Sequence, residues 1–144
     1  MIEWRFKGAD FSRAAAQADP ASLASPASKP GPDGLESLTR AAWARPRIPL
    51  VPGEEPSAMA RTLLVADSGS GVSAALPVSD YTFVNVDLTV ILPRDPVGEW
   101  LLLEASTTIG AQGTGLATTV LSDERGSFGR AVQTLIVAPV ARPR

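Results

Sequence analysis

Residues 82–108 read TFVNVDLTVILPRDPVGEWLLLEASTT and contain the two most strand-like runs of the chain, joined by a turn. In the first run, apolar residues at 86, 88, 90 and 92 alternate with polar residues at 85, 87 and 89, which predicts a strand with one buried face. Two prolines and a glycine in 93–98 predict a chain reversal. A second strand, 99–108, follows. Asp87 therefore shares a face with other polar groups and is the clearest candidate catalytic carboxylate.

Further strands are predicted on both sides of this stretch. Residues 2–7 alternate between apolar and charged side chains and predict a first strand, whose apolar face needs a partner. A second strand is predicted within 38–51, where Pro46 and Pro49 favour an edge or bulged position. The turn SDERG at 122–126 joins two β-rich runs, 116–121 and 128–137, and predicts a hairpin.

One helix is predicted within PGEEPSAMARTLLVADSGSG, residues 52–71. Glu54 and Glu55 favour the positive end of a helix dipole, Pro56 suits a first turn, and Gly69 and Gly71 favour a C-terminal stop. Residues 59, 63 and 66 fall on one apolar stripe, which 64 and 65 widen, so the helix is expected to be buried. The element order predicts an α+β fold, with an antiparallel sheet wrapped around one central helix.

Composition bounds the possible classes of protein. A chain of 144 residues, 44% of them hydrophobic, is predicted to form a single domain over residues 1–144. Residues from about 12 to 37 are rich in Ala, Ser, Pro and Gly, which predicts a disordered insertion. A net charge of -2 and a pI near 5.1 favour no nucleic-acid partner. The absence of a long apolar run and of a signal-peptide core predicts no membrane association and a cytoplasmic location.

The chain contains neither histidine nor cysteine, which excludes several kinds of active site. A Ser-His-Asp triad, a cysteine nucleophile, a usual zinc site and an Asp/His hydratase dyad cannot be assembled from it. Any catalysis must use carboxylates, hydroxyls, amides, Lys or Arg. No cofactor and no metal are expected.

Two segments resemble a known family. The run VNVDLTVILPRDPVGEWLLLEASTTIGAQGTGLATTVLSDERGSFGRAVQTLIV, residues 84–137, resembles the C-terminal half of TesB-like acyl-CoA thioesterases. The upstream run PRIPLVPGEEPSAMARTLLVADSGSGVSAAL, residues 46–76, is similar to the helix-bearing part of the same half. The resemblance implies a hotdog fold, in which a sheet rolls around a central helix, and an acyl-CoA substrate.

The resemblance also implies three site residues that hold the hydrolytic water. They are an aspartate at Asp87 in VNVDLT, a hydroxyl at Thr108 in EASTT and an amide at Gln133 in RAVQTLIV. Thr107 is the alternative hydroxyl, because a shift of one residue in a strand moves a side chain to the opposite face. A thioester carbonyl is already activated, so an oriented water, a base and donors to the oxyanion suffice.

Other interpretations of these residues remain open. Asp87 could be a solvated strand residue or an ion-pair partner of Arg94, and Gln133 could be a buried amide satisfied by backbone groups. Arg45, Arg47 and Arg61 could contact coenzyme A phosphates or simply be solvated. TesB-like chains carry two hotdogs with the site at their seam, so we expect a homodimer or a pairing with another hotdog subunit. The alternative function is a non-catalytic hotdog that binds acyl groups or a partner chain.

Overall fold

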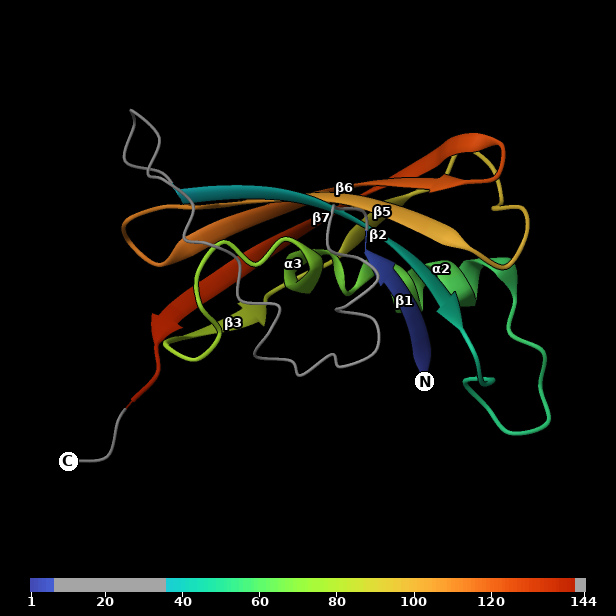
Figure 1. Cartoon of the computed structure of the whole chain (residues 1–144), viewed down its shortest axis with the longest axis horizontal. Coiled ribbons are helices and arrows are strands. Elements are labelled where there is room, and N and C mark those ends of the chain that lie inside the picture. Colours follow the sequence, from blue (N-terminus) through green and yellow to red (C-terminus); the bar gives the residue numbers. More distant parts are fainter. Residues whose placement is uncertain (7–35, 142–144) are drawn as a thin grey trace.

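The computed structural model describes residues 1–6 and 36–141, which form one antiparallel sheet with two short helices against one face (Figure 1). The strands pair in the order β1-β2-β5-β6-β7-β3, and β4 also pairs with β7. The strands are β1 (Ile2–Phe6), β2 (Glu36–Pro46), β3 (Tyr81–Asn85), β4 (Thr89–Ile91), β5 (Leu101–Ile109), β6 (Thr114–Asp123) and β7 (Gly126–Pro139), and the helices are α2 (Ala58–Ala66) and α3 (Gly69–Val72). This arrangement confirms the predicted α+β hotdog fold.

The three long strands β5, β6 and β7 form the centre of the sheet. Alternate residues of each strand face the helices and are buried, as the period of two requires. Leu103 pairs with Leu121 across β5 and β6, and Phe128 on β7 is only 2% exposed. The predicted hairpin is confirmed, with Asp123 opposite Gly126, whose φ of 99° suits a tight turn. The inner face of these strands therefore provides the floor on which the helices pack.

The structure confirms the predicted first strand and corrects the predicted position of the second strand in the sheet. β1 pairs with β2 and packs its partly buried Ile2, Trp4 and Phe6 against the core. The sequence predicts an edge or bulged position for this strand, but β2 lies between β1 and β5, pairs with both in an unbroken register and ends at Pro46. The two prolines do not interrupt the ladder, because they fall at and beyond its end. The insertion predicted at about 12–37 lies outside the described residues, except that 36 and 37 begin β2.

The central helix is shorter and more exposed than the sequence predicted. α2 begins after Ser57, whose Oγ accepts a hydrogen bond of 3.1 Å from the backbone N–H of Ala60, so Ser57 is the N-cap. Glu54 and Glu55 lie before the helix. The buried residues of α2 are Thr62, Val65 and Ala66, whereas Met59 and Leu63 of the predicted apolar stripe are 53% and 42% exposed. Two short helices follow one another here, because the chain turns at residues 67–68 before α3.

Among the described residues no helix is long and apolar enough to cross a membrane.

The strand predicted around Asp87 is broken into β3 and β4, which pair with successive parts of β7. Asn85 pairs with Leu135, and Thr89 pairs with Val132. The segment therefore advances four residues between these two pairs while β7 advances three. One extra residue is a bulge, and a bulge changes which face the side chains meet. As a result Val86 is 58% exposed while Leu88 packs against the core. The uninterrupted alternation expected from 85 to 92 is therefore wrong at residues 86–88.

An ion pair between partly exposed Arg94 and buried Asp123 fixes the loop that links β4 to β5. Arg94 donates to both carboxylate oxygens of Asp123, at 2.6 and 2.9 Å, and Asp123 is 4% exposed. The same carboxylate accepts hydrogen bonds from the backbone N–H groups of Val97 and Arg125. The fork from Arg94, followed by these two N–H groups, holds the pKa of Asp123 well below its usual value. Arg94 therefore pairs with Asp123, and not with Asp87 as one interpretation of the sequence allowed.

We predict that Asp123→Ala lowers the free energy of unfolding by about 3 kcal/mol, because it removes a buried, fully bonded carboxylate. The pKa of Asp123 is lower in the folded protein than in the unfolded chain, where it has the ordinary value of about 4. Asp123 therefore stabilises the fold above about pH 4, and this contribution is lost as the pH falls toward the pKa of the folded state. Urea unfolding between about pH 5 and about pH 2 measures both effects. Exposed Asp95→Ala is the control. Equal midpoints for the two variants would contradict the prediction.

Candidate active site

Gln133 is buried on the inner face of β7, with 1% of the residue exposed. It pairs with Ala117 on β6, which in turn pairs with Thr107 on β5, and all three residues are buried. The strand alternation that buries Leu135 and Ala131 also directs Gln133 toward the helices. A polar amide thus lies at the centre of an otherwise largely apolar face.

Two backbone groups at the junction of α2 and α3 satisfy this amide. Nε2 of Gln133 donates to the backbone carbonyl of Asp67 at 2.9 Å, and Oε1 accepts from the backbone N–H of Ser70 at 3.0 Å. The structure therefore agrees with the interpretation of Gln133 as a satisfied buried amide. These two hydrogen bonds also connect the helix junction to the sheet, which gives the amide a structural role.

Asn85 completes a closed set of hydrogen bonds with the same junction. Its Nδ2 donates to Oδ1 of Asp67 at 3.0 Å, and its Oδ1 accepts from the hydroxyl of Ser70 at 3.1 Å. Asp67 and Ser70 are thus held by β3 through Asn85 and by β7 through Gln133. We call these four residues, Asp67, Ser70, Asn85 and Gln133, the junction network.

Gly69 lets the helix junction approach the sheet closely enough for this network. A Cβ on Gly69 would lie 2.5 Å from Oγ1 of Thr119 and 3.1 Å from Oε1 of Gln133. The first distance is too short for any side chain, so only glycine fits without a shift of its neighbours. Ser73, in the same turn, shares a buried hydrogen bond of 2.7 Å with Thr107.

An open groove of about 690 Å³ lies beside the junction network. One end of the groove is polar and is formed by Asp67, Ser68, Ser70 and Asn85. The remainder is mostly apolar and is formed by Gly71, Ala74, Val78, Tyr81, Phe83 and Val84. A polar end joined to an apolar channel is the usual composition of a site that orients one end of an apolar ligand.

The structure places Asp87 away from Gln133. Asp87 is exposed in the bulge between β3 and β4, and both its carboxylate oxygens accept hydrogen bonds from Thr134, Oδ1 from the backbone N–H at 2.9 Å and Oδ2 from the hydroxyl at 3.1 Å. Thr134 follows Gln133 in β7, so its side chain points to the opposite face of the sheet. Within this chain Asp87 and Gln133 therefore lie on opposite sides of β7.

The hydroxyl that shares the face of Gln133 belongs to Thr107, not to Thr108. Thr107 is fully buried and pairs with Ala117, whereas Thr108 is partly exposed on the outer face. The ambiguity between these two neighbours arises because successive strand residues point in opposite directions. None of the three residues carried over from the family resemblance lines the groove, and only Gln133 hydrogen-bonds to residues that do, Asp67 and Ser70.

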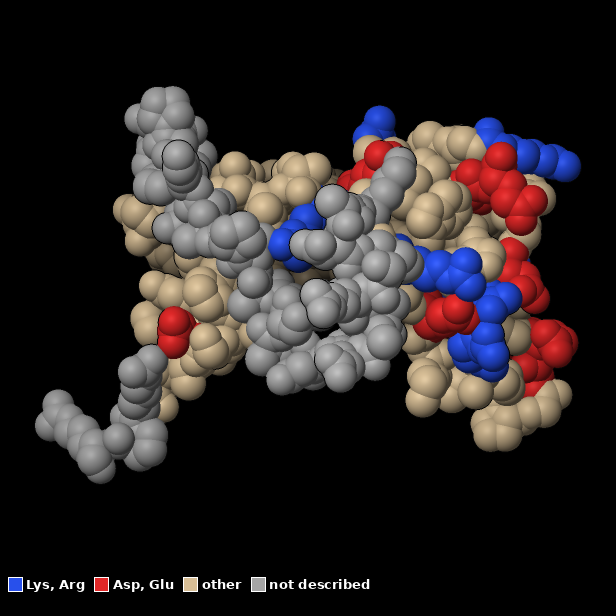
Figure 2. Space-filling model, viewed as in Figure 1, with Lys and Arg blue, Asp and Glu red and all other residues tan. Residues whose placement is uncertain are grey.

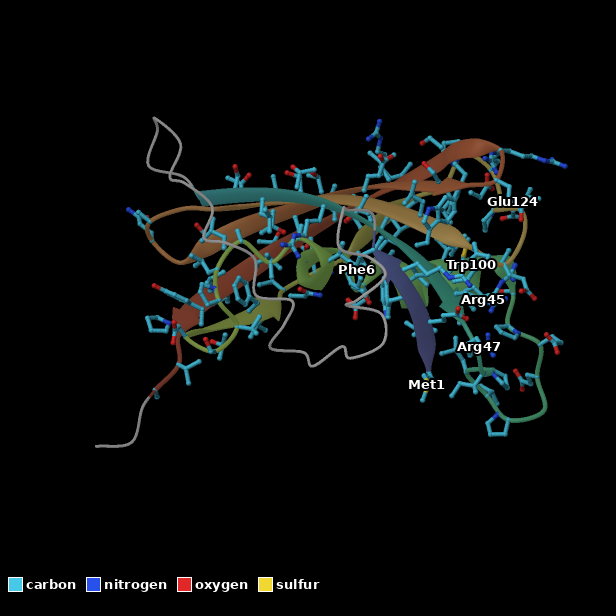
Figure 3. The ribbon with its side chains drawn as sticks, viewed as in Figure 1. Met1, Phe6, Arg45, Arg47, Trp100 and Glu124 are labelled. Atoms are coloured by element: carbon cyan, nitrogen blue, oxygen red, sulfur yellow. The ribbon has the colours of Figure 1, made fainter. Side chains whose placement is uncertain are left out.

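The arginines considered for phosphate binding are already engaged at the β1 end of the sheet. Arg45 and Arg47 donate to Glu3 at 2.7 and 2.8 Å, and hydrogen bonding from Arg45 above all lowers the pKa of Glu3 to about 2. Figure 3 shows Arg45 beside Trp100, where the guanidinium lies 4.8 Å from the ring centre. Basic and acidic side chains interleave on this end of the molecule, without a patch of one sign (Figure 2).

Arg61 lies apart from this pair, beside a smaller pocket of about 210 Å³. Its buried Nε has no hydrogen-bond partner among the described residues. The pocket is lined by both signs of charge, since Glu55 and Glu99 accompany Arg47 and Arg61. This balance gives no specific support to a phosphate site.

Comparison with known proteins identifies the family. Residues 3–137 match the model of the acyl-CoA thioesterase C-terminal domain. The chain belongs to this family. The resemblance to the C-terminal half of TesB-like thioesterases is thereby confirmed, and no curated protein matches the sequence.

Solved structures of thioesterases share the fold of this family member. An acyl-CoA thioesterase II, TesB2, from Mycobacterium marinum has a TM-score of 0.63 at 16% identity, over 99% of this chain and 52% of that one. A tesB protein from Mycobacterium avium subsp. paratuberculosis has a TM-score of 0.54 at 16% identity, over 80% and 54%. A thioesterase from Haemophilus influenzae has a TM-score of 0.54 at 16% identity, over 97% of both chains. The present chain thus spans about half the length of the two TesB-type proteins.

Three members of the junction network were not identified from the sequence. Asp67 and Ser70 lie in DSGSG, where Gly69 and Gly71 predict the end of the helix, and the alternation predicts Asn85 only as a polar strand residue. The available signal was the pair of glycines at 69 and 71. Glycine inside a helix is unfavourable unless a neighbouring backbone or side chain approaches closely.

We predict that Gly69→Ala lowers the free energy of unfolding by about 1–3 kcal/mol, because the new methyl overlaps Thr119. Gly71→Ala is the matched control in the same helix, since a Cβ there meets no atom within 4 Å. It should be neutral or stabilising by up to about 1 kcal/mol. Thermal and urea unfolding measure both, and Thr119→Ala added to Gly69→Ala should restore part of the loss. A Gly69→Ala protein as stable as Gly71→Ala would contradict the close approach.

Proposed function

We propose that this chain hydrolyses acyl-CoA thioesters at the groove beside the junction network. The observation that carries the proposal is the family match over residues 3–137, joined to a groove with one polar and one apolar end. The apolar end suits an acyl chain, and the polar end supplies donors and a carboxylate for the thioester group. Hydrolysis needs only an attacking water, a proton acceptor and stabilisation of the developing oxyanion.

The three residues carried over from the resemblance have different support in this proposal. Gln133 holds the polar end of the groove in place, because it hydrogen-bonds to the backbone of Asp67 and Ser70. The role of Asp87 as base and of Thr108 as the hydroxyl that holds the water rests on the sequence match alone. Both remain predictions. Asp87→Asn is the variant that tests the first, and Thr108→Val, compared with Thr107→Val, tests the second.

A non-catalytic hotdog remains the second candidate function. The observation that favours it is that the chain spans about half of the TesB-type proteins with the same fold. A chain of this kind would bind an acyl group or a partner hotdog in the same groove without turning over a substrate.

The activity prediction is release of coenzyme A thiol from at least one of butanoyl-CoA, octanoyl-CoA and palmitoyl-CoA, followed with a thiol-reactive dye. The chain has no cysteine, so it adds no background. Gln133→Ala should lower turnover by at least about 10-fold, because the groove loses the amide that fixes Asp67 and Ser70. Circular dichroism serves as the folding control. Folded wild-type protein that releases no thiol from any of the three would favour the non-catalytic hotdog.

We further predict a homodimer in which the groove lies at the interface between the two copies. Six aliphatic side chains, each at least 36% exposed, lie in the bulge or on the face of the sheet opposite Gln133; Val84 among them also lines the groove, and exposed apolar side chains favour association. They are Val84, Val86, Ile91, Leu116, Val132 and Ile136. Light scattering at micromolar concentration should give twice the mass of the chain. A monomer at that concentration would contradict this prediction.

A further inference from the structure

We infer that the apolar part of the groove accommodates about ten carbons of an acyl chain, which makes medium-chain acyl-CoAs the ligands that fill it. This inference rests on the proposed binding of acyl-CoA at the groove and adds the length of the acyl chain to it. The length follows from two contacts between the walls of the groove and from the strand that separates those contacts.

Two segments form the walls of the groove and run in opposite directions. One consists of residues 67–78, which include α3, and the other is β3. At the polar end the hydroxyl of Ser70 donates to Oδ1 of Asn85 at 3.1 Å. At the other end the backbone N–H of Tyr81 donates to the carbonyl of Pro77 at 3.1 Å. The walls therefore meet at both ends, and the groove extends between these two contacts.

The length of β3 sets the distance between the two ends of the groove. Tyr81 and Asn85 are the first and last residues of this strand, four steps apart. Four steps along a strand span about 13 Å. An extended alkyl chain advances about 1.3 Å per carbon, because its C–C bonds of about 1.5 Å form a zigzag. About ten carbons therefore reach from the polar end of the groove to Tyr81.

Two aromatic side chains of β3 give the groove a fixed apolar surface. Tyr81 and Phe83 line the groove, and both are partly buried against a core cluster that includes Leu135 and Val137. Side chains that the core already holds lose little conformational entropy when a ligand binds to them. This surface is therefore ready to receive an alkyl chain.

Two valines that also line the groove are exposed. Val78 is 52% exposed and Val84 is 56% exposed. An alkyl chain that lies along the groove removes part of their surface from water, and each methylene contributes in proportion to the area that it buries. Carbons that extend past Tyr81 lie beyond the groove and contribute little. Affinity should therefore rise with chain length and then level off.

Gly71 leaves the α3 side of the groove open. It lines the groove, and a Cβ there would meet no atom of the described residues within 4 Å. Its φ is not positive, and no close contact in the described part of the chain requires a glycine, in contrast to Gly69. A leucine at 71 has room to extend over the groove without displacing its neighbours, so this position offers a test.

The test measures the Kd of non-hydrolysable S-alkyl-CoA thioethers by isothermal titration calorimetry, with butyl-, hexyl-, octyl-, decyl-, dodecyl- and hexadecyl-CoA. Because these compounds are not cleaved, the measurement does not depend on turnover. The Kd should fall about two-fold to four-fold for each carbon added up to decyl-CoA, four-fold being the effect of a fully buried methylene. It should change by less than about two-fold between decyl-CoA and hexadecyl-CoA.

Three variants show whether the groove is responsible for this profile. Gly71→Leu should weaken decyl-CoA by at least about 10-fold and remove most of the dependence on chain length, because its side chain occupies the space of several methylenes. Val78→Ser should weaken decyl-CoA more than butyl-CoA. Ala111→Leu is the matched control, since it adds a leucine at an exposed position outside the groove, and it should bind as the wild type does. Melting temperatures check that each variant is folded.

The possible outcomes separate the inference from the proposed function. No measurable binding, a Kd independent of chain length, or a Kd that keeps falling from decyl-CoA to hexadecyl-CoA would overturn the inference. A wild-type profile in folded Gly71→Leu would do the same. If thiol is released from acyl-CoAs in any of these cases, the thioesterase proposal stands. The expected binding profile without thiol release would overturn the thioesterase proposal and leave the length of the groove intact.

Discussion

The close contact between Gly69 and the inner face of the sheet is the constraint on which the rest of the site depends. Because Gly69 has no Cβ, the chain between α2 and α3 reaches Thr119 and Gln133. A buried amide is tolerated only when its donor and acceptor are paired, and here the backbone of residues 67 and 70 pairs both. The sheet and the helix junction therefore fix each other, and the groove inherits its polar end from that contact.

The bulge between β3 and β4 is the second feature that shapes the site. One extra residue turns Leu88 toward the core and leaves Asp87 exposed beside Thr134, on the other side of β7 from Gln133. Bulges occur next to active sites because they re-aim side chains without changing the rest of a strand. In this chain the bulge separates two residues that the family resemblance brings together, while Asn85, two residues earlier, still reaches the junction.

Family membership and local geometry answer different questions about this protein. The match over residues 3–137 establishes the domain and its fold, because both follow from patterns spread along the whole chain. The chemistry depends on a few side chains, and a fold can keep its architecture while a site is built from different residues. The chain spans about half the length of two TesB-type proteins that share its fold.

The sequence by itself determined where the strands lie, apart from the break at 86–88, as well as the hairpin at 122–126, the approximate place of the helix and the family, because alternation, turn residues and motifs are local properties. It also gave the face of Gln133, which shares a period of two with Ala131 and Leu135. Only the tertiary structure decided that Thr107 rather than Thr108 lies on that face, that Asp87 turns away, and that Asp67 meets Gln133 across 66 positions of the chain. A one-residue slip reverses every side chain of a strand, and contacts between distant segments leave no periodic trace, so neither could be deduced from local pattern.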